Sequence, residues 1–259
     1  MSGEIVRALQ LWPVWLRLGI QDVRLRFRRS LLGIAWVFLN LTISLLTIGF
    51  IYSSLLGQDL KKFLPFLTIG LVVWSYLTAA VVEGGMAFIA AEGYIRQIGV
   101  PLFVYLFRSF VSVSLFMLLN LITYFPVAYF SGLTLHYGML WAVPGLLLMA
   151  SVVLLFITIF AYLHTRFRDA IPFASALLQV VFYVTPVIWP PEALRQQGLH
   201  WVIDYNPFYH LLEVIRQPLL QAEPASTLSY LMVALLIGGL MVIAASCVWR
   251  YHQRIVYFL

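Results

Sequence analysis

The chain has 259 residues, of which 63% are hydrophobic and only 10% are charged. A soluble domain usually carries about 25% charged and about 45–50% apolar residues, so this composition excludes a water-soluble fold and predicts a membrane protein. The formal net charge of +6 would suggest a nucleic-acid partner in a soluble protein, but in a membrane protein we interpret it as topology and expect no nucleic acid.

Residues 1–32 predict an amphipathic helix that lies in the cytoplasmic membrane interface. Apolar residues recur at helical spacing from Leu9 to Leu31, and arginines and a glutamine occupy another face. Pro13 suits the first turn of a helix, so we expect the regular helix to begin there. This helix serves either as a surface anchor held by anionic lipids or as a docking face for a cytoplasmic partner.

Six stretches are long and apolar enough to cross a bilayer, which takes about 20 mostly apolar residues. All six are continuously apolar, unlike the alternating segments of outer-membrane strands. We therefore predict an all-α polytopic membrane protein with six transmembrane helices. The predicted spans are Gly33–Leu56, Phe63–Val82, Leu102–Phe130, Met139–Leu163, Ile171–Trp189 and Leu228–Trp249.

The basic residues orient these spans. With the N-terminus in the cytoplasm, 12 of the 16 lysines and arginines fall on the inner side, which predicts that both termini are cytoplasmic. The chain, 1–259, is predicted to form a single transmembrane domain. Its parts are the interface helix at 1–32, spans one to five at 33–189, outer helices at 190–227, span six at 228–249 and a cytoplasmic tail at 250–259.

Two inner links carry polar residues that a partner subunit could contact. The longer link, Glu83–Pro101, predicts a short helix that would transmit a partner's movement as a rigid lever, although an ordinary solvated loop is the alternative. Gly84 and Gly85 are expected to loosen the exit of the second span. The lever residues are Glu92, Gly93, Tyr94, Arg96 and Gln97, and the shorter link offers Arg166, Arg168 and Asp169 as a hinge at the base of the fifth span.

The segment between the last two spans predicts short outer helices. Trp189 is followed by two prolines, which cannot continue the fifth helix. Asn206 can cap a new helix that Pro207 opens. We expect this helix to end near Gln217, before Pro218, and it is then too short to span the membrane.

On that outer helix, Glu213 and Arg216 stand three residues apart and are expected to form an exposed pair. The apolar residues of the helix share another face. We therefore predict a re-entrant or interfacial helix at the outer surface.

Four stretches, in this order, resemble the membrane subunit of type-2 ABC exporters, specifically the permeases that export O-antigen and related polysaccharides. Together with the six-span layout, the resemblance covers nearly the whole chain. The stretches are RFRRSLLGIAW at 26–36, AAEGYIRQIGVPLFVY at 90–105, HTRFRDAIPFASALLQVVFYVTPVIWPPEAL at 164–194 and YNPFYHLLEVIRQPLL at 205–220.

The resemblance implies a homodimer with two copies of a nucleotide-binding ATPase subunit in the bacterial inner membrane. The chain has no phosphate-binding motif of the form G-x-x-x-x-G-K-[ST], so ATP and Mg would be held by that partner and this chain needs no cofactor. By the same resemblance, the lever of the longer inner link is the coupling helix that sits in a groove of the ATPase. The outer helix that Asn206 caps would be part of a gate.

The resemblance also implies a lipid-linked polysaccharide as substrate, and two groups of residues fit it. The arginines before the first span would attract the pyrophosphate of the lipid carrier, and aromatic rings near mid-span would stack on the apolar faces of sugar rings. The alternative is that these aromatics are packing residues of the core or of the lipid-facing surface. The arginines are Arg24, Arg26, Arg28 and Arg29, and the aromatics are Trp74, Tyr76, Phe182 and Tyr183.

Other functions stay open at this stage. Exporters of capsule, teichoic acid or another amphiphile would share the pattern. An ion-coupled carrier would usually show acids within its spans and broken helices, and a membrane enzyme would need clustered polar residues at one membrane face. Neither pattern is found in the sequence, and no spacing of histidines and cysteines predicts a metal site.

Overall fold

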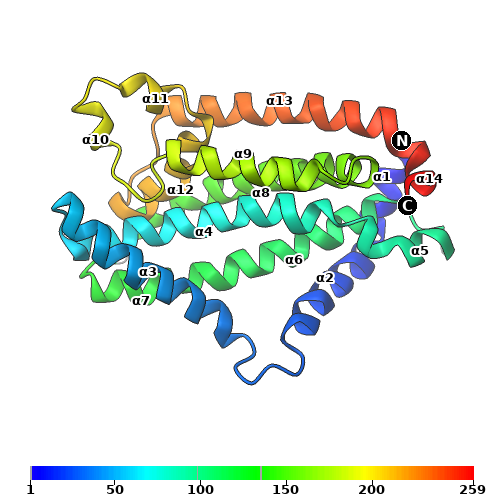
Figure 1. Ribbon diagram of the computed structural model, residues 1–259, viewed down its shortest axis with the longest axis horizontal. Coiled ribbons are helices and arrows are strands. Elements are labelled where there is room, and N and C mark those ends of the chain that lie inside the picture. The colour runs from blue at the N-terminus through cyan, green and yellow to red at the C-terminus, as the bar shows by residue number, and fades with distance from the viewer. Residues whose placement is uncertain (1, 98, 135) are drawn as a thin grey trace.

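The computed structural model describes residues 2–97, 99–134 and 136–259, and every regular element in these ranges is helical. The long helices lie lengthwise beside one another, and both termini lie at one end of the bundle (Figure 1). In chain order the elements are α1 (Ser2–Gln10), α2 (Trp12–Phe27), α3 (Ala35–Leu56), α4 (Leu60–Gly85), η1 (Ile89–Ala91), α5 (Glu92–Gln97), α6 (Phe103–Ile122), α7 (Tyr124–Phe130), η2 (Tyr137–Trp141), α8 (Ala142–Arg166), α9 (Ala170–Val184), α10 (Glu192–Arg195), α11 (His200–Asp204), α12 (Pro207–Gln221), α13 (Thr227–Tyr251), η3 (His252–Arg254) and α14 (Ile255–Phe258).

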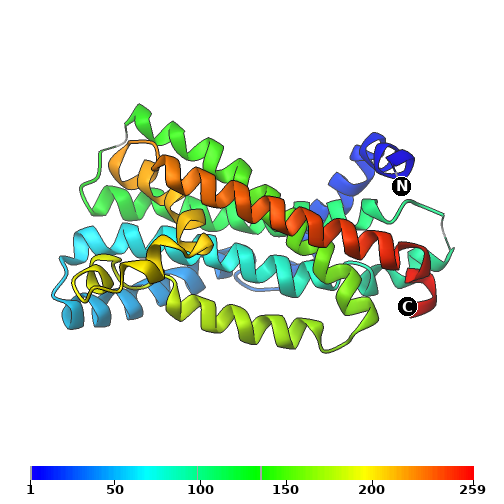
Figure 2. The same ribbon diagram turned by 90° about the horizontal axis from the view of Figure 1, so that it is seen from above.

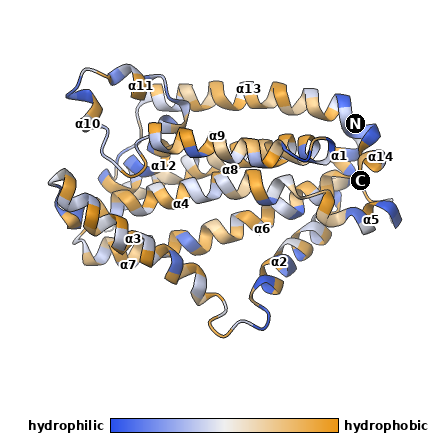
Figure 3. Cartoon of the chain, viewed as in Figure 1, coloured by the Kyte–Doolittle hydropathy of each residue, from blue (hydrophilic) through white to orange (hydrophobic). Residues whose placement is uncertain are grey.

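Within the described residues, five helical stretches are long and apolar enough to cross a membrane. They are α3, α4, α6 with α7, η2 with α8, and α13 with the turns that follow it. Their residues are mostly hydrophobic, whereas hydrophilic residues gather at the two ends of the bundle, on α5 and α10 (Figure 3). We call the end that holds both termini the terminal end and the opposite end, where α10 and α11 lie, the distal end (Figure 2). The all-helical membrane class is thus confirmed.

The fifth predicted span, Ile171–Trp189, is a shorter helix than the sequence suggested. The helix α9 has 15 residues and ends at Val184, well before the two prolines that were expected to end it. Thr185 precedes Pro186, and the residue before a proline is biased toward extended backbone. Thr185 indeed has φ −86° and ψ 136°. The chain then continues to Pro190 without regular structure.

The N-terminal segment is two helices. Pro13 lies in the first turn of α2, as its fixed φ favours, so the predicted start is correct to within a residue. The helical stripe was expected to continue to Leu31, but α2 ends at Phe27. A turn follows in which Arg29 has φ 67° and Gly33 has φ 53°. The helices α2 and α3 diverge from the bundle and meet in this turn (Figure 1).

The helix α4 lies at the centre of the bundle. In the apolar stretch of 18 residues that qualifies each helix as a span, 67% of the α4 residues are buried, against 11% of the α3 residues. Most of the α3 surface is therefore uncovered. Gly84 and Gly85 were expected to loosen the end of the second span, which is wrong. Both are part of α4, and a Cβ on Gly84 would lie 2.4 Å from Ile157 Cγ1 of α8. These glycines therefore allow α4 and α8 to pack closely.

The outer helix is longer than expected because Pro218 does not end it. A proline inside a helix removes the hydrogen bond to the carbonyl four residues earlier, which here is that of Val214. That carbonyl is approached closely by Gly145 of α8, where a Cβ would come within 2.1 Å of the oxygen. Close packing of the two helices therefore holds α12 together up to Gln221.

Candidate functional site

Two ion pairs fix the amphipathic helix α2 to the bundle. Arg26 donates two hydrogen bonds to the carboxylate of Glu83 in the last turn of α4, one of them at 2.7 Å. Arg108 of α6 donates to both carboxylate oxygens of Asp22, each at 2.6 Å. Fork-shaped pairs of this kind fix orientation as well as distance. We call these four residues the α2 junction.

The α2 junction surrounds a cavity of about 560 Å³ between α2, α4 and α6. Its wall includes Met86, Ala87 and Ala90, which lie in the turn that leads from α4 to α5. The hydrogen bonds to the carboxylate of Glu83 raise the pKa of the Arg26 guanidinium. Glu83 thus lies in contact with the amphipathic helix, at the point where α4 passes into the inner link.

The four arginines predicted to attract a lipid headgroup divide into two kinds. Arg26 is engaged by Glu83, and its guanidinium also lies over the ring of Phe116 at 4.6 Å from the centroid. The remaining three are exposed at the end of α2 and in the turn after it. Arg24 and Arg28 line a cleft of about 410 Å³ whose other walls are mostly apolar.

The inner link forms the short helix that the sequence predicted. Glu92–Gln97 make up α5, which lies at the terminal end of the bundle (Figure 1). Arg96 and Glu92 form an ion pair at 3.0 Å along the helix, and 55% of the Tyr94 surface is exposed. None of the α5 residues is buried, although Ile95 packs half-buried against the core. The exposed residues Gly93, Tyr94, Arg96 and Gln97 are available to a partner.

The second inner link joins α8 to α9 over a few residues. Arg166 ends α8, and its guanidinium lies over the rings of Phe167 and Phe258 at 5.1 and 4.9 Å from their centroids. Asp169 is the residue before α9 and makes no side-chain cap to it. The three residues predicted as a hinge are thus neighbours at a sharp turn, where the guanidinium of Arg166 packs on aromatic rings.

The four mid-span aromatics do not form one surface within a single chain. Trp74 and Phe182 pack at 5.4 Å between ring centroids, and Trp74 is buried. Tyr76 faces α6 instead, where its hydroxyl lies 2.6 Å from that of Ser114. Tyr183 is 59% exposed on α9. Tyr183 therefore lies on the outer side of the bundle, Trp74 and Tyr76 lie in its interior, and the half-buried Phe182 lies between them.

Arg216 was expected to be exposed on α12, and this is wrong. Its side chain is only 2% exposed, and that of Glu213, 3.6 Å away, is 17% exposed. The guanidinium donates to the carbonyl oxygens of Pro186 at 2.8 Å and Val187 at 3.3 Å. It also lies 3.8 Å from the centroid of the Phe66 ring. Arg216 therefore ties α12 to the irregular segment after α9 and to α4.

The start of α12 is as predicted. The side chain of Asn206 accepts hydrogen bonds from the backbone amides of Phe208 and Tyr209, at 2.9 and 3.3 Å, and Pro207 occupies the first turn. The amide group of Asn206 also donates to the hydroxyl of Thr185 at 3.0 Å. Asn206 therefore also holds the end of α9 against the start of α12.

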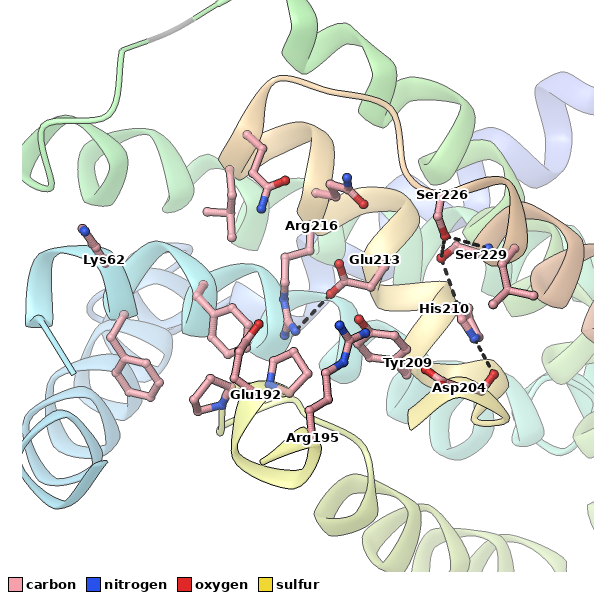
Figure 4. A pocket seen from close by; sticks show the side chains of 18 of the residues that line it. Lys62, Glu192, Arg195, Asp204, Tyr209, His210, Glu213, Arg216, Ser226 and Ser229 are labelled. Atoms are coloured by element: carbon pink, nitrogen blue, oxygen red, sulfur yellow. Dashed lines mark hydrogen bonds and ion pairs between the residues drawn. The ribbon is translucent and has the colours of Figure 1, made fainter. Parts of the chain in front are cut away.

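Beside these residues lies a second cavity, of about 450 Å³, at the distal end of the bundle. Figure 4 shows Arg216 and Glu213 on one wall, with Glu192 and Arg195 of α10 facing them. Burial raises the pKa of Glu213, while the positive charge of Arg216 opposes that rise. Nothing in the sequence pattern distinguished this buried pair from an exposed one.

An apolar helical bundle with an amphipathic helix fixed to it, and with polar groups confined to its ends, defines a polytopic membrane protein. The chain belongs to the ABC-2 type transporter family, whose sequence pattern matches residues 14–220. The match runs from the first turn of α2 to the last turn of α12.

Two known proteins show how similar the chain is to individual relatives. It is 26% identical over 229 residues to the O-antigen export system permease protein RfbA of Myxococcus xanthus. This alignment covers 83% of this chain and 85% of the relative. It is 25% identical over 200 residues to a protein of the same name from Klebsiella pneumoniae, with 74% of each chain covered.

Proposed function

We propose that this chain is the transmembrane subunit of an ATP-driven exporter that moves a lipid-linked polysaccharide of the O-antigen kind across the bacterial inner membrane. The observation that carries the proposal is membership of the ABC-2 type transporter family, together with two relatives named as O-antigen export permeases. ATP and Mg would be bound by a separate nucleotide-binding subunit. Two copies of each subunit would form the transporter.

The helix α5 is the part of the chain that would receive energy from the ATPase. It is short, has no buried residue and lies at the terminal end, which would be the cytoplasmic side. Glu83 stands a few residues before it and is bound to Arg26. A displacement of α5 would therefore move the end of α4 and, through the ion pair, the amphipathic helix α2.

The lipid carrier would meet the chain where α2 turns into α3. Arg24 and Arg28 line a cleft with apolar walls at that turn, and Arg29 is exposed beside them. A pyrophosphate next to an acyl chain needs this combination of fixed positive charge and apolar surface. Because α3 is so little covered within one chain, it would also form part of the contact with the second copy.

Six crossings would place both termini in the cytoplasm. The helix α9 would be about 22 Å long at 1.5 Å per residue, which is short of a hydrocarbon core of about 30 Å. The irregular segment from Thr185 to Pro190 would complete this crossing. Non-helical backbone is tolerated at membrane depth where protein covers it, and Arg216 binds two of its carbonyls.

Co-purification tests the coupling part of the proposal. The chain would be expressed with the nucleotide-binding subunit of its transporter, and the double variant Y94A/R96E would be compared with K61E, a change at the distal end. We expect Y94A/R96E to lose the ATPase while still inserting into the membrane, and K61E to retain it. Retention of the ATPase by Y94A/R96E at the level of the unaltered protein would contradict the assignment of α5.

The headgroup assignment needs a separate test. We expect R24Q/R28Q/R29Q to lower the amount of glycan that reaches the cell surface, with insertion and ATPase assembly unchanged. The matched control is R7Q/R17Q/R254Q, which removes three other exposed arginines. Equal export by the two triple variants would contradict the headgroup assignment, because the arginines at this turn would then have no greater effect on export than arginines elsewhere.

A further inference from the structure

The cavity at the distal end has the form of a ligand site that the proposed transport cycle does not require. Its volume of about 450 Å³ lies within the range of small-molecule pockets. Its walls come from the start of α4, from α10, from α12 and from the start of α13. Figure 4 shows side chains from these separate elements converging on one space.

The charges around this cavity balance. Lys62, Arg195 and Arg216 face three acids, and Glu213 is the acid paired with Arg216. The other two acids are Glu192 and Asp204. A site for phosphate or another anion would carry an excess of positive charge, as sites built from arginine do. The balance therefore favours a neutral ligand that both donates and accepts hydrogen bonds.

The uncharged lining fits the same kind of ligand. Gln58, Gln217 and Gln221 add amide groups, each of which offers two donors and an acceptor. The rings of Phe63 and Phe66 give one wall an apolar surface. Carboxylates, guanidinium groups and amides are planar groups that can bond two neighbouring hydroxyls at once, and aromatic rings accept the C–H faces of sugars.

We propose that this cavity is a saccharide-binding subsite at the distal end, which takes a neutral sugar unit of the exported glycan. The inference rests on the proposed function, because it assumes that the glycan emerges at this end. Arg216 holds the walls in place through its bonds to the segment after α9, and Glu192 and Arg195, two exposed residues of α10, contact the sugar. The subsite would hold the emerging chain beside the outer helices.

Saturation-transfer NMR on the transporter, assembled with its ATPase in lipid nanodiscs, tests this subsite. The probes are N-acetylglucosamine, galactose, mannose and, separately, inorganic phosphate. We expect at least one sugar to bind to the unaltered protein and E192Q/R195Q to weaken that binding about tenfold, since each change removes a charged hydrogen-bond partner. The matched control K61Q/E223Q makes the same charge changes at exposed residues outside the cavity and should bind normally.

Three outcomes would overturn the proposal: no sugar binds, E192Q/R195Q binds sugar as well as the control does, or only phosphate binds. Surface display of the glycan is measured in the same strains. If the unaltered chain restores display in cells that lack it and yet binds no sugar, the subsite is wrong and the exporter stands. If it does not restore display, the exporter itself is wrong.

Discussion

Arg26 and Glu83 form a two-bonded ion pair that joins the last turn of the amphipathic helix α2 to the last turn of α4. Both side chains are partly exposed, at 42% and 32%, so the pair contributes only about 0.2–1 kcal/mol to stability. Because this contribution to stability is small, we infer that the pair serves to couple the movements of α2 and α4. It joins the helix beside the proposed headgroup site to the helix that leads into α5.

Charge reversal tests that link. We expect R26E and E83R each to reduce export several-fold with little loss of folded protein, because like charges then face each other. The double variant R26E/E83R restores opposite charges and should recover a large part of the export. The measurement is surface glycan per unit of membrane-inserted chain. A double variant no better than either single one would exclude a role for the pair itself.

Replacement of Arg216 should destabilise the distal end strongly. The variant R216M leaves Glu213 buried without its counter-charge and removes the donor to two carbonyls, so we expect a loss of about 3–5 kcal/mol. R195M, at an exposed position, should stay within about 0.5 kcal/mol of the unaltered protein. Thermal unfolding of the detergent-solubilised protein measures both. Equal stability of the two variants would contradict the buried position of Arg216.

Glu213 should make stability depend on pH. Burial raises its pKa, so the folded protein keeps this proton to a higher pH than the unfolded chain does. The resulting contribution to stability is present at low pH and is lost as the pH rises through the raised pKa. The stability of the unaltered protein relative to E213Q should therefore fall as the pH rises from the ordinary carboxyl pKa of 4.5 through the raised pKa of the folded protein. A relative stability that rises over that interval would refute the direction of the shift.

Two glycines in long helices should respond oppositely to a methyl group. A Cβ on Gly145 would meet the backbone oxygen of Val214 at 2.1 Å, and a backbone atom cannot move aside cheaply. We expect G145A to cost about 1–3 kcal/mol, as overpacking does. Gly238 of α13 has nothing within 4 Å of such a methyl group, so G238A should be neutral or slightly stabilising. Unfolding midpoints of the two variants, compared side by side, decide between these expectations.

The features that the sequence predicted well depend on local signals. The cap of Asn206 on the helix that Pro207 opens involves residues two and three positions away, and it forms as expected. The apolar stretches likewise fix most span boundaries to within a few residues, because burial in lipid needs only hydrophobic length. The short helix α5 at Glu92–Gln97 also forms as the sequence predicted.

The features that the sequence did not predict depend on contacts between distant residues. Arg26 and Glu83 are 57 positions apart, and Arg108 and Asp22 are 86 apart. A single acid in a helix rich in arginine was the available signal for Asp22, but its partner lies on another helix. Arg216 looked exposed because an ion pair three residues apart has the same spacing on any face of a helix. Its burial follows from the packing of α12 among α4, α8 and α13, which no local pattern encodes.

Export of a lipid-linked polysaccharide from the cytoplasm at the expense of ATP is the activity that we propose for this chain. Its most direct test is deletion of the gene, followed by measurement of the glycan at the cell surface and of the lipid-linked glycan retained in the inner membrane. We expect the surface glycan to disappear, the retained form to accumulate, and both to return to normal only when the chain is supplied with a hydrolysis-competent ATPase. Normal surface glycan in the deletion strain, with no retained form, would contradict the claim.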